Sequence, residues 1–156
     1  MTDSEPRRLH DRAAIHDLLA RLARAQDDRD WPTLTGCFEP GIVYDHPGGQ
    51  LVGVDAVVER SRRALSPLDA SQHLIGTILV TFIDDMTATS TSYFHSQHVR
   101  TGAVGGDNYA IAGTYRDQLS RRSGEWLVAR RTQEYTWRQG NPEVTRRPAD
   151  DSDQRS

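Results

Sequence analysis

The chain has 156 residues, of which 36% are hydrophobic and 26% charged, a composition typical of one soluble globular domain with a single core. Its net charge of −3 and the lack of a basic face argue against a nucleic-acid partner, and no apolar stretch resembles a membrane span or the core of a signal peptide. The single cysteine, Cys37, excludes an internal disulfide and favours a cytoplasmic location.

The N-terminal quarter of the chain predicts two helices. Residues 1–6 are expected to form a loose arm, followed by a helix over 7–28 with Arg and Asp on its outer face. The inner face of this helix is an apolar stripe with three- and four-residue spacing, formed by Ile15, Leu18, Leu19 and Leu22. Asp30 is then expected to cap a short helix over 31–38, which stops at Glu39-Pro40-Gly41.

The rest of the chain predicts a hairpin, one more helix and a run of strands. A strand over 42–46 and a turn over 47–49 lead into 50–52, which can pair back, and 54–65 shows helical spacing. Further strands are expected at 73–83, 86–101, 108–121 and 125–137. The polar tail, 138–156, is expected to be disordered or to drape over a partner.

The order of these elements indicates the fold class. Helices that come early and strands that come late favour an α+β fold over a parallel α/β sheet. A long, twisted sheet can curl around the first helix as a cone and enclose a deep pocket lined by alternate strand positions. We therefore expect one domain over residues 7–137, with a strongly curved antiparallel or mixed sheet wrapped around the N-terminal helices.

Asp27 and His73 are the residues whose positions most suggest chemistry. Asp27 closes the first helix, His73 opens the strand-rich half, and the layout of elements suggests that they meet in one pocket. A carboxylate that orients an imidazole makes a general base near neutral pH. The alternatives are a core histidine with backbone partners and a surface carboxylate. However, Asp27, Asp28 and Asp30 crowd the negative end of a helix dipole, and a buried imidazolium would explain one of them.

His98 is a third candidate. On the strand 86–101 it shares a face with Phe94 and Ser96, whereas His95 lies on the opposite face. Only one of the two histidines can therefore face a cavity, and the pair is a poor metal site. For His95 we expect a position outside the sheet or at an interface.

Several aromatic residues could also reach a pocket. Tyr44 and His46 share the first strand, and Tyr109 and Tyr115 share one face of a later strand, although such residues more often pack than react. Trp31 is expected in the core or at the rim of the pocket. The sequence contains no phosphate-binding glycine loop, dinucleotide fingerprint, zinc helix or nucleophile elbow, so we expect no metal or cofactor.

Five short motifs occur in a characteristic order: Arg12-Ala13-Ala14-Ile15, Asp27 three residues before Asp30-Trp31, Gln72-His73-Leu74-Ile75-Gly76, Gly113-Thr114-Tyr115-Arg116-Asp117 and Gly124-Glu125-Trp126. Together they resemble the scytalone-dehydratase-like, SnoaL-like branch of the nuclear-transport-factor-2-like superfamily, over roughly residues 12–137. This resemblance implies a cone-shaped, cystatin-like α+β barrel with a deep pocket, often assembled as a homodimer or homotrimer.

The resemblance also implies roles for single residues. Asp27 and His73 take the positions of the family's catalytic dyad, and His98 is implied as a second polar residue in the pocket. The positions that differ from scytalone dehydratase are Gln26 and His46, where it has tyrosines, and Gly113 and Tyr115, where it has a serine and an asparagine. These departures argue against the same substrate and leave the dyad intact.

The leading hypothesis is a cofactor-independent lyase that acts on a small hydrophobic ring or polyketide-type molecule. His73 would remove a proton, Asp27 would orient its ring, Tyr44 or Tyr115 would stabilise an enolate, and His98 would position or protonate the leaving group. Isomerisation, dehydrohalogenation and cyclisation use the same proton abstraction and remain open. A ligand-binding or assembly subunit without activity is the alternative of another class.

Overall fold

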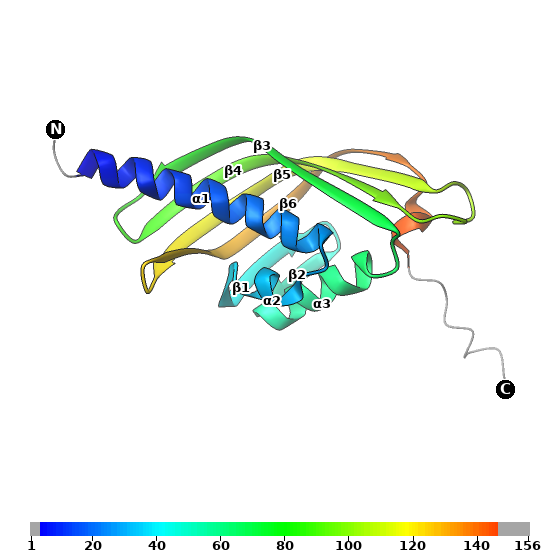
Figure 1. Ribbon diagram of the computed structural model, residues 1–156, viewed down its shortest axis with the longest axis horizontal. Helices are drawn as coiled ribbons and strands as arrows, with labels where there is room; N and C mark the ends of the chain where they lie inside the picture. Colours follow the sequence, from blue (N-terminus) through cyan, green and yellow to red (C-terminus); the bar gives the residue numbers. More distant parts are fainter. Residues whose placement is uncertain (1–3, 147–156) are drawn as a thin grey trace.

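The computed structural model describes residues 4–146, which form one sheet with helices on its inner face (Figure 1). The helices are α1 (Ser4–Asp27), α2 (Trp31–Thr35), α3 (Val54–Leu65) and the 3₁₀-helix η1 (Pro142–Thr145). The strands are β1 (Phe38–His46), β2 (Gly49–Val52), β3 (Ala70–Phe82), β4 (Thr87–Val99), β5 (Asn108–Arg122) and β6 (Glu125–Gly140). Their order is β2-β1-β6-β5-β4-β3, with β1 and β6 parallel and the other neighbours antiparallel. The α+β fold with a mixed sheet is therefore confirmed.

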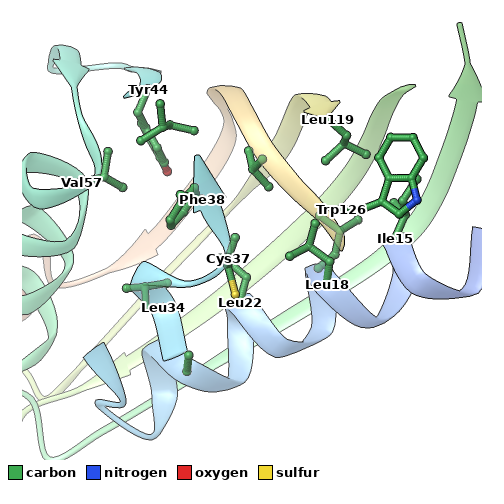
Figure 2. Packing of buried hydrophobic residues seen from close by; sticks show 14 of the residues in the cluster. Ile15, Leu18, Leu22, Leu34, Cys37, Phe38, Tyr44, Val57, Leu119 and Trp126 are labelled. Carbon is green, nitrogen blue, oxygen red and sulfur yellow. The ribbon is translucent and has the colours of Figure 1, made fainter. Parts of the chain in front are cut away.

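The apolar stripe of α1 forms the centre of the core. Figure 1 shows α1 lying along the sheet, with α2 and α3 beside its C-terminal end. The four stripe residues, Ile15, Leu18, Leu19 and Leu22, are at most 2% exposed. Figure 2 shows part of this stripe packed against Leu119 and Trp126 of the sheet and against Cys37. Each fully buried Leu or Ile contributes ~1.5–3 kcal/mol, so packing rather than helix propensity holds α1 in place.

Bulges in β3 and β6 bend the sheet around α1. One extra residue interrupts β3 between Gly76 and Leu79, and β6 carries two more, Ala129 and Thr136, opposite β5. A bulge increases the local twist and reverses which side chains face the core. In β6 the inward residues are therefore even-numbered as far as Val128 and odd-numbered from Arg131 to Tyr135.

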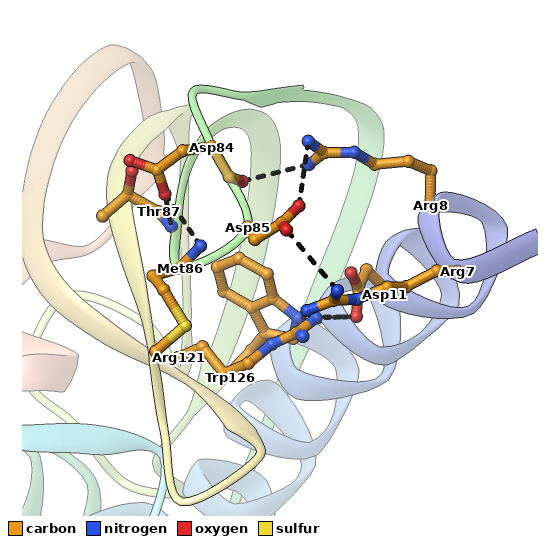
Figure 3. Close-up of polar contacts among 9 residues, drawn as sticks. All are labelled: Arg7, Arg8, Asp11, Asp84, Asp85, Met86, Thr87, Arg121 and Trp126. Atoms are coloured by element: carbon orange, nitrogen blue, oxygen red, sulfur yellow. Dashed lines mark hydrogen bonds and ion pairs between the residues drawn. The ribbon is translucent and has the colours of Figure 1, made fainter. Parts of the chain in front are cut away.

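The N-terminal half of α1 is tied to the far end of the sheet by polar contacts (Figure 3). Asp11 accepts hydrogen bonds from the guanidinium of Arg121 and from the indole N–H of Trp126. Arg8 donates to the carbonyl oxygen of Asp84, at the β3–β4 turn, at 3.0 Å.

Among the described residues, no helix is both long and apolar enough to cross a membrane.

The second helix is shorter than expected. α2 ends at Thr35 rather than Phe38, because Phe38 pairs with Val128 of β6 and begins β1. Pro40 and Gly41, which were expected to end the second helix, lie inside β1. The register shift between Phe38 and Val43 interrupts the β1–β6 pairing there, so Pro40 does not have to donate a ladder hydrogen bond.

The first helix begins earlier and the last strand ends later than expected. Helix α1 begins at Ser4, inside the segment predicted to be a loose arm. Strand β6 runs to Gly140 because its last residues pair with the start of β5, and η1 then packs Val144, which is 0% exposed, against Tyr109 and Leu65. The part of the predicted tail up to Arg146 is thus ordered, and residues 1–3 and 147–156 lie outside the described range.

Gly113 of β5 lies against the main chain of β6, with no room for a side chain. A Cβ at Gly113 would sit 1.9 Å from the carbonyl oxygen of Glu134, which is main chain and cannot rotate away. We expect Gly113→Ala to lower the free energy of unfolding in urea by ~1–3 kcal/mol or more. The control is Gly76→Ala, because a Cβ there meets nothing within 4 Å. Equal stability of the two variants would contradict this account of the β5–β6 contact.

Candidate active site

Asp27 and His73 are in direct contact, although 46 residues separate them. Asp27 is the last residue of α1, and its Oδ1 lies 2.7 Å from His73 Nδ1. Its Oδ2 accepts a hydrogen bond from the backbone N–H of His73 at 2.8 Å. The side chains of His73 and Asp27 are only 7% and 14% exposed. This two-point attachment fixes both the position of β3 beside α1 and the orientation of the imidazole ring.

Arg29 and Ser71 hold the carboxylate of Asp27 from behind. Ser71 donates its hydroxyl to Asp27 Oδ1 at 3.0 Å, and Arg29 donates to the Ser71 oxygen at 2.8 Å. Arg29 also donates to the backbone carbonyl of Asp27 at 2.9 Å, from a left-handed backbone conformation with φ of 57°. A non-glycine residue in that conformation is uncommon and is retained where its surroundings determine it. The turn after α1 is thus built around the carboxylate.

The contacts of Asp27 determine its charge. Burial raises the pKa of Asp27, but hydrogen bonds from the side chain and backbone of His73 and from Ser71 outweigh it, so the net pKa lies below the ordinary value. Asp27 is therefore ionised at neutral pH and only accepts hydrogen bonds. Neutral His73 then carries its proton on Nδ1 and leaves Nε2 able to accept one.

His98 lies beside this pair on β4. Its ring centroid is 5.8 Å from that of His73 and the two rings are nearly perpendicular, at 85°. His98 Nδ1 lies 3.2 Å from the backbone carbonyl oxygen of Tyr109, which makes Nδ1 the protonated nitrogen. Burial first, and then the nearby His73, lower the pKa of His98 to about 4. His98 is therefore neutral at pH 7, with Nε2 as a hydrogen-bond acceptor.

The two histidines line a cavity of about 170 Å³. Its apolar surface comes from Ala64, Leu65 and Ile111. Its polar surface comes from His73, His98, Gln26, Tyr44, Arg60, Ser61, Ser96, Tyr115, Gln133, Tyr135 and Thr145. The cavity thus has an apolar wall and a polar lining that includes His73, which suits binding and orienting a small molecule.

Tyr44 and Tyr115 lie in this lining but are held differently. Tyr44 donates its hydroxyl to Gln133 Oε1 at 3.2 Å. Tyr115 is stacked on Phe94, with ring centroids 4.4 Å apart, and is covered on its other face by Arg131, whose guanidinium carbon lies 3.9 Å from the ring centroid. Within residues 4–146 the Tyr115 hydroxyl makes no hydrogen bond, so a molecule in the cavity can use it.

The structure keeps three of the candidate residues out of the cavity. His46 folds back on the β1–β2 turn, where its Nδ1 accepts a hydrogen bond from Gly48 N–H at 3.0 Å. Trp31 fills the junction between α2 and α3, with Arg62 over its ring. The side chain of Tyr109 packs with Leu65 and with Val144 of η1 and does not line the cavity, although its ring centroid lies 6.4 Å from that of His98.

Arg60, Gln133 and Arg131 were not expected at the site. Arg60 lies on the inward side of α3, three residues after the buried Val57, and helical spacing alone could have placed it there. Gln133 and Arg131 face inward only because the bulge at Ala129 changes which residues of β6 point to the core. No residue pattern in the sequence predicted that bulge. No group of three or more His, Cys, Asp or Glu side chains in 4–146 is arranged to hold a metal ion.

The low pKa of His98 predicts a pH dependence of stability. In the unfolded chain an ordinary histidine titrates near ~6.5, whereas His98 in the fold titrates at about 4. Between these values the unfolded state binds more protons, so stability is full above pH ~6.5 and falls as the pH drops toward 4. We expect a loss on the order of 3 kcal/mol over this window, with a smaller loss in His98→Gln.

Urea unfolding at pH 7 and pH 4.5 measures this difference. Asp27 does not disturb the window, because its own pKa lies below the ordinary carboxyl value of 3.8. Equal pH dependence in the two proteins would contradict a neutral, buried His98.

The curved mixed sheet, the inner helix and the cavity between them define an α+β protein with a cystatin-like fold. The chain belongs to the SnoaL-like domain family, whose model matches residues 7–132, which confirms the resemblance noted in the sequence. No curated protein sequence matches the chain.

Solved structures show the same fold. A putative scytalone dehydratase from Novosphingobium aromaticivorans is 19% identical, with a TM-score of 0.81 over 96% of this chain and 98% of that chain. The hexachlorocyclohexane dehydrochlorinase LinA, type 2, is 19% identical, with a TM-score of 0.77 over 92% of this chain and 97% of that chain. A protein of unknown function from Mycobacterium tuberculosis, Rv3472, is 21% identical, with a TM-score of 0.74 over 83% of this chain and 74% of that chain. At these identities the likeness concerns the fold.

Proposed function

We propose that the protein is a cofactor-independent lyase in which His73 removes a proton from carbon and Asp27 orients and stabilises the imidazole. The observation that carries this proposal is the 2.7 Å contact between Asp27 Oδ1 and His73 Nδ1 beside a cavity that His73 itself lines. An imidazole fixed on one nitrogen by a carboxylate, with the other nitrogen directed at a bound molecule, is the arrangement of a general base.

The simplest reaction for this geometry is the loss of water. His73 Nε2 takes a proton from the carbon next to a carbonyl, the C–H electron pair forms a C=C bond, and the bond from the neighbouring carbon to its hydroxyl breaks. The departing hydroxide takes a proton from the imidazolium of His73, which returns to its neutral form. Asp27 stabilises the positive charge that His73 carries between these steps.

The remaining polar groups have separate tasks in this proposal. Neutral His98 accepts a hydrogen bond from the hydroxyl that leaves, which orients it but supplies no proton, so the role of acid expected from the sequence passes to His73. Burial raises the pKa of Tyr115, so its hydroxyl stays protonated and can donate to the enolate oxygen. Tyr44, whose hydroxyl is already used by Gln133, supports the wall.

The size of the cavity indicates what it can hold. A cavity of about 150 Å³ holds a benzene molecule, so about 170 Å³ is large enough for a compound with one ring. The names of two structural neighbours, a dehydrochlorinase and a putative scytalone dehydratase, denote eliminations and agree with the proposed class of reaction. Isomerisation, dehydrohalogenation and cyclisation remain alternatives with the same first step.

A ligand-binding or assembly subunit is the second candidate. Such a subunit needs no paired base, and bulky side chains would be expected to fill its vestigial pocket. The unfilled cavity beside the Asp27–His73 pair favours the enzyme.

Hydrogen–deuterium exchange tests the step that all the proposed reactions share. A one-ring ketone is incubated with the protein in D₂O, its binding is followed by NMR, and deuterium uptake at the carbon next to the carbonyl is measured. We expect faster exchange with the wild type than with His73→Ala. If a ketone that binds exchanges no faster with the wild type than with His73→Ala, proton abstraction by His73 is rejected.

We further propose that the protein acts in the cytoplasm as a homodimer or homotrimer. The outer face of the sheet exposes Leu74, Tyr93 and Trp137, which are 58%, 60% and 44% exposed. Apolar groups gathered on one face are typical of an interface. Sedimentation of the wild type and of Tyr93→Asp tests this, and a monomeric wild type would contradict it.

A further inference from the structure

Arg60 is a cation in the cavity lining that has no anionic partner among residues 4–146. It lies on α3, and its Nη2 donates to the neutral Gln133 Oε1 at 3.4 Å. Its two neighbours on the helix, Arg62 and Arg63, both form ion pairs with Glu59. Within residues 4–146 Arg60 forms no ion pair. An arginine that is partly buried without a carboxylate is the group that anionic oxygens bind most strongly.

The other charges at the cavity are balanced. Arg131, which covers Tyr115, forms a bidentate ion pair with Asp117 at 2.7 and 2.8 Å. The charge of Asp27 is shared among hydrogen bonds from His73 and Ser71, with Arg29 close behind. Among the described residues, Arg60 is therefore the charged side chain of the cavity lining that lacks a counter-ion.

Arg60 and the dyad lie on opposite sides of the cavity. The contacts of Arg60 are to Gln133 of β6 and to the ring of Tyr44 of β1, while His73 lies on β3, at the other edge of the sheet. Strands β4 and β5 separate them. A ligand that spans the cavity can thus place one end against Arg60 and the other against His73.

We infer that the cavity binds a one-ring compound with a carboxylate or equivalent anionic oxygen, which Arg60 holds so that the opposite side of the ring faces His73. The Tyr115 hydroxyl, free of protein partners within 4–146 and placed on the strand between the two sides, can donate to a second oxygen of the same molecule. The inference about binding stands on the geometry of Arg60, and the statement that this ligand is also the substrate rests on the proposed function.

Benzoate and benzamide are the probes, because they share size and shape and differ in charge. Their dissociation constants are measured by NMR titration of the whole chain, with the ring signals of His73 and His98 reporting the site. We expect the wild type to bind benzoate about tenfold or more tightly than benzamide. Arg60→Gln should lose this preference and keep its affinity for benzamide. Arg63→Gln, an exposed change one helical turn away, should behave as the wild type.

Equal affinity for the two probes in the wild type, a preference that survives Arg60→Gln, or benzoate binding that leaves the histidine signals unmoved would each overturn the inference. Failure of the proposed function looks different. If the charge preference depends on Arg60 but the wild type exchanges the α-proton of a bound ketone no faster than His73→Ala, the anion site stands and the catalytic proposal falls. If exchange depends on His73 but the wild type shows no preference for benzoate, the catalytic proposal stands and the anion site falls.

Discussion

Replacing His73 by alanine should reduce turnover by ~10²–10⁴-fold while the protein stays folded. In the Asp27–His73 pair, Nε2 of His73 is the nitrogen that can accept the substrate's proton. His98 cannot replace it as a base oriented by Asp27, because its Nδ1 is hydrogen-bonded to the carbonyl oxygen of Tyr109. Loss of the ring also leaves a void beside an existing cavity, which costs stability, so unfolding in urea is measured alongside the initial rate of product formation.

Asp27→Asn should give a loss of similar size by another route. The asparagine amide has one acceptor oxygen in place of two and cannot balance an imidazolium, and its NH₂ group cannot accept from the backbone N–H of His73. The matched control is Asp28→Asn, because Asp28 is the neighbouring carboxylate after the same helix and forms no hydrogen bond or ion pair with His73. Full activity in His73→Ala and Asp27→Asn would remove the dyad from the mechanism.

Asp117→Ala should cause a large loss of stability. The ion pair between Asp117 and Arg131 is almost fully buried, with side chains 0% and 3% exposed. Removal of one partner leaves a buried charge without its counter-ion, which typically costs ~3–5 kcal/mol. The free energy of unfolding in urea, measured at pH 7, gives this difference directly.

The exposed pair between Arg116 and Glu134 provides the control for this prediction. Its side chains are 57% and 53% exposed, so Glu134→Gln should change stability by less than about 1 kcal/mol. The double change Asp117→Leu with Arg131→Met should recover much of the loss, because no charge then remains buried. A loss below about 1 kcal/mol in Asp117→Ala would contradict the role given to this pair.

The sequence predicted the architecture well because its signals are local. The stripe on α1 and the spacing in 54–65 identify helices by period, and the long alternating segments identify strands. Where prediction failed, a tertiary contact decided. Phe38 lies in β1 rather than in the helix because it pairs with Val128. The segment after Trp137 is ordered because it pairs with β5 and because Val144 is buried.

The site was predictable only in part. The order of motifs and the alternation of β4 predicted that His98, His73 and Asp27 share one pocket. In the structure the three side chains lie side by side. Alternation could not find Gln133, because the bulge at Ala129 reverses the parity of β6. It also could not exclude Tyr109, whose side chain shares a face with Tyr115 but is covered by η1.

The most direct test of the Asp27–His73 pair is the protonation pattern of the His73 ring, read from ¹⁵N NMR of the labelled protein with neutral imidazoles. The wild type should show one tautomer, with the proton on Nδ1 and a free Nε2 whose signal moves when a one-ring ligand binds. Asp27→Asn should lose this single tautomer. A mixture of tautomers in the wild type, or the same spectrum in both proteins, would contradict the account.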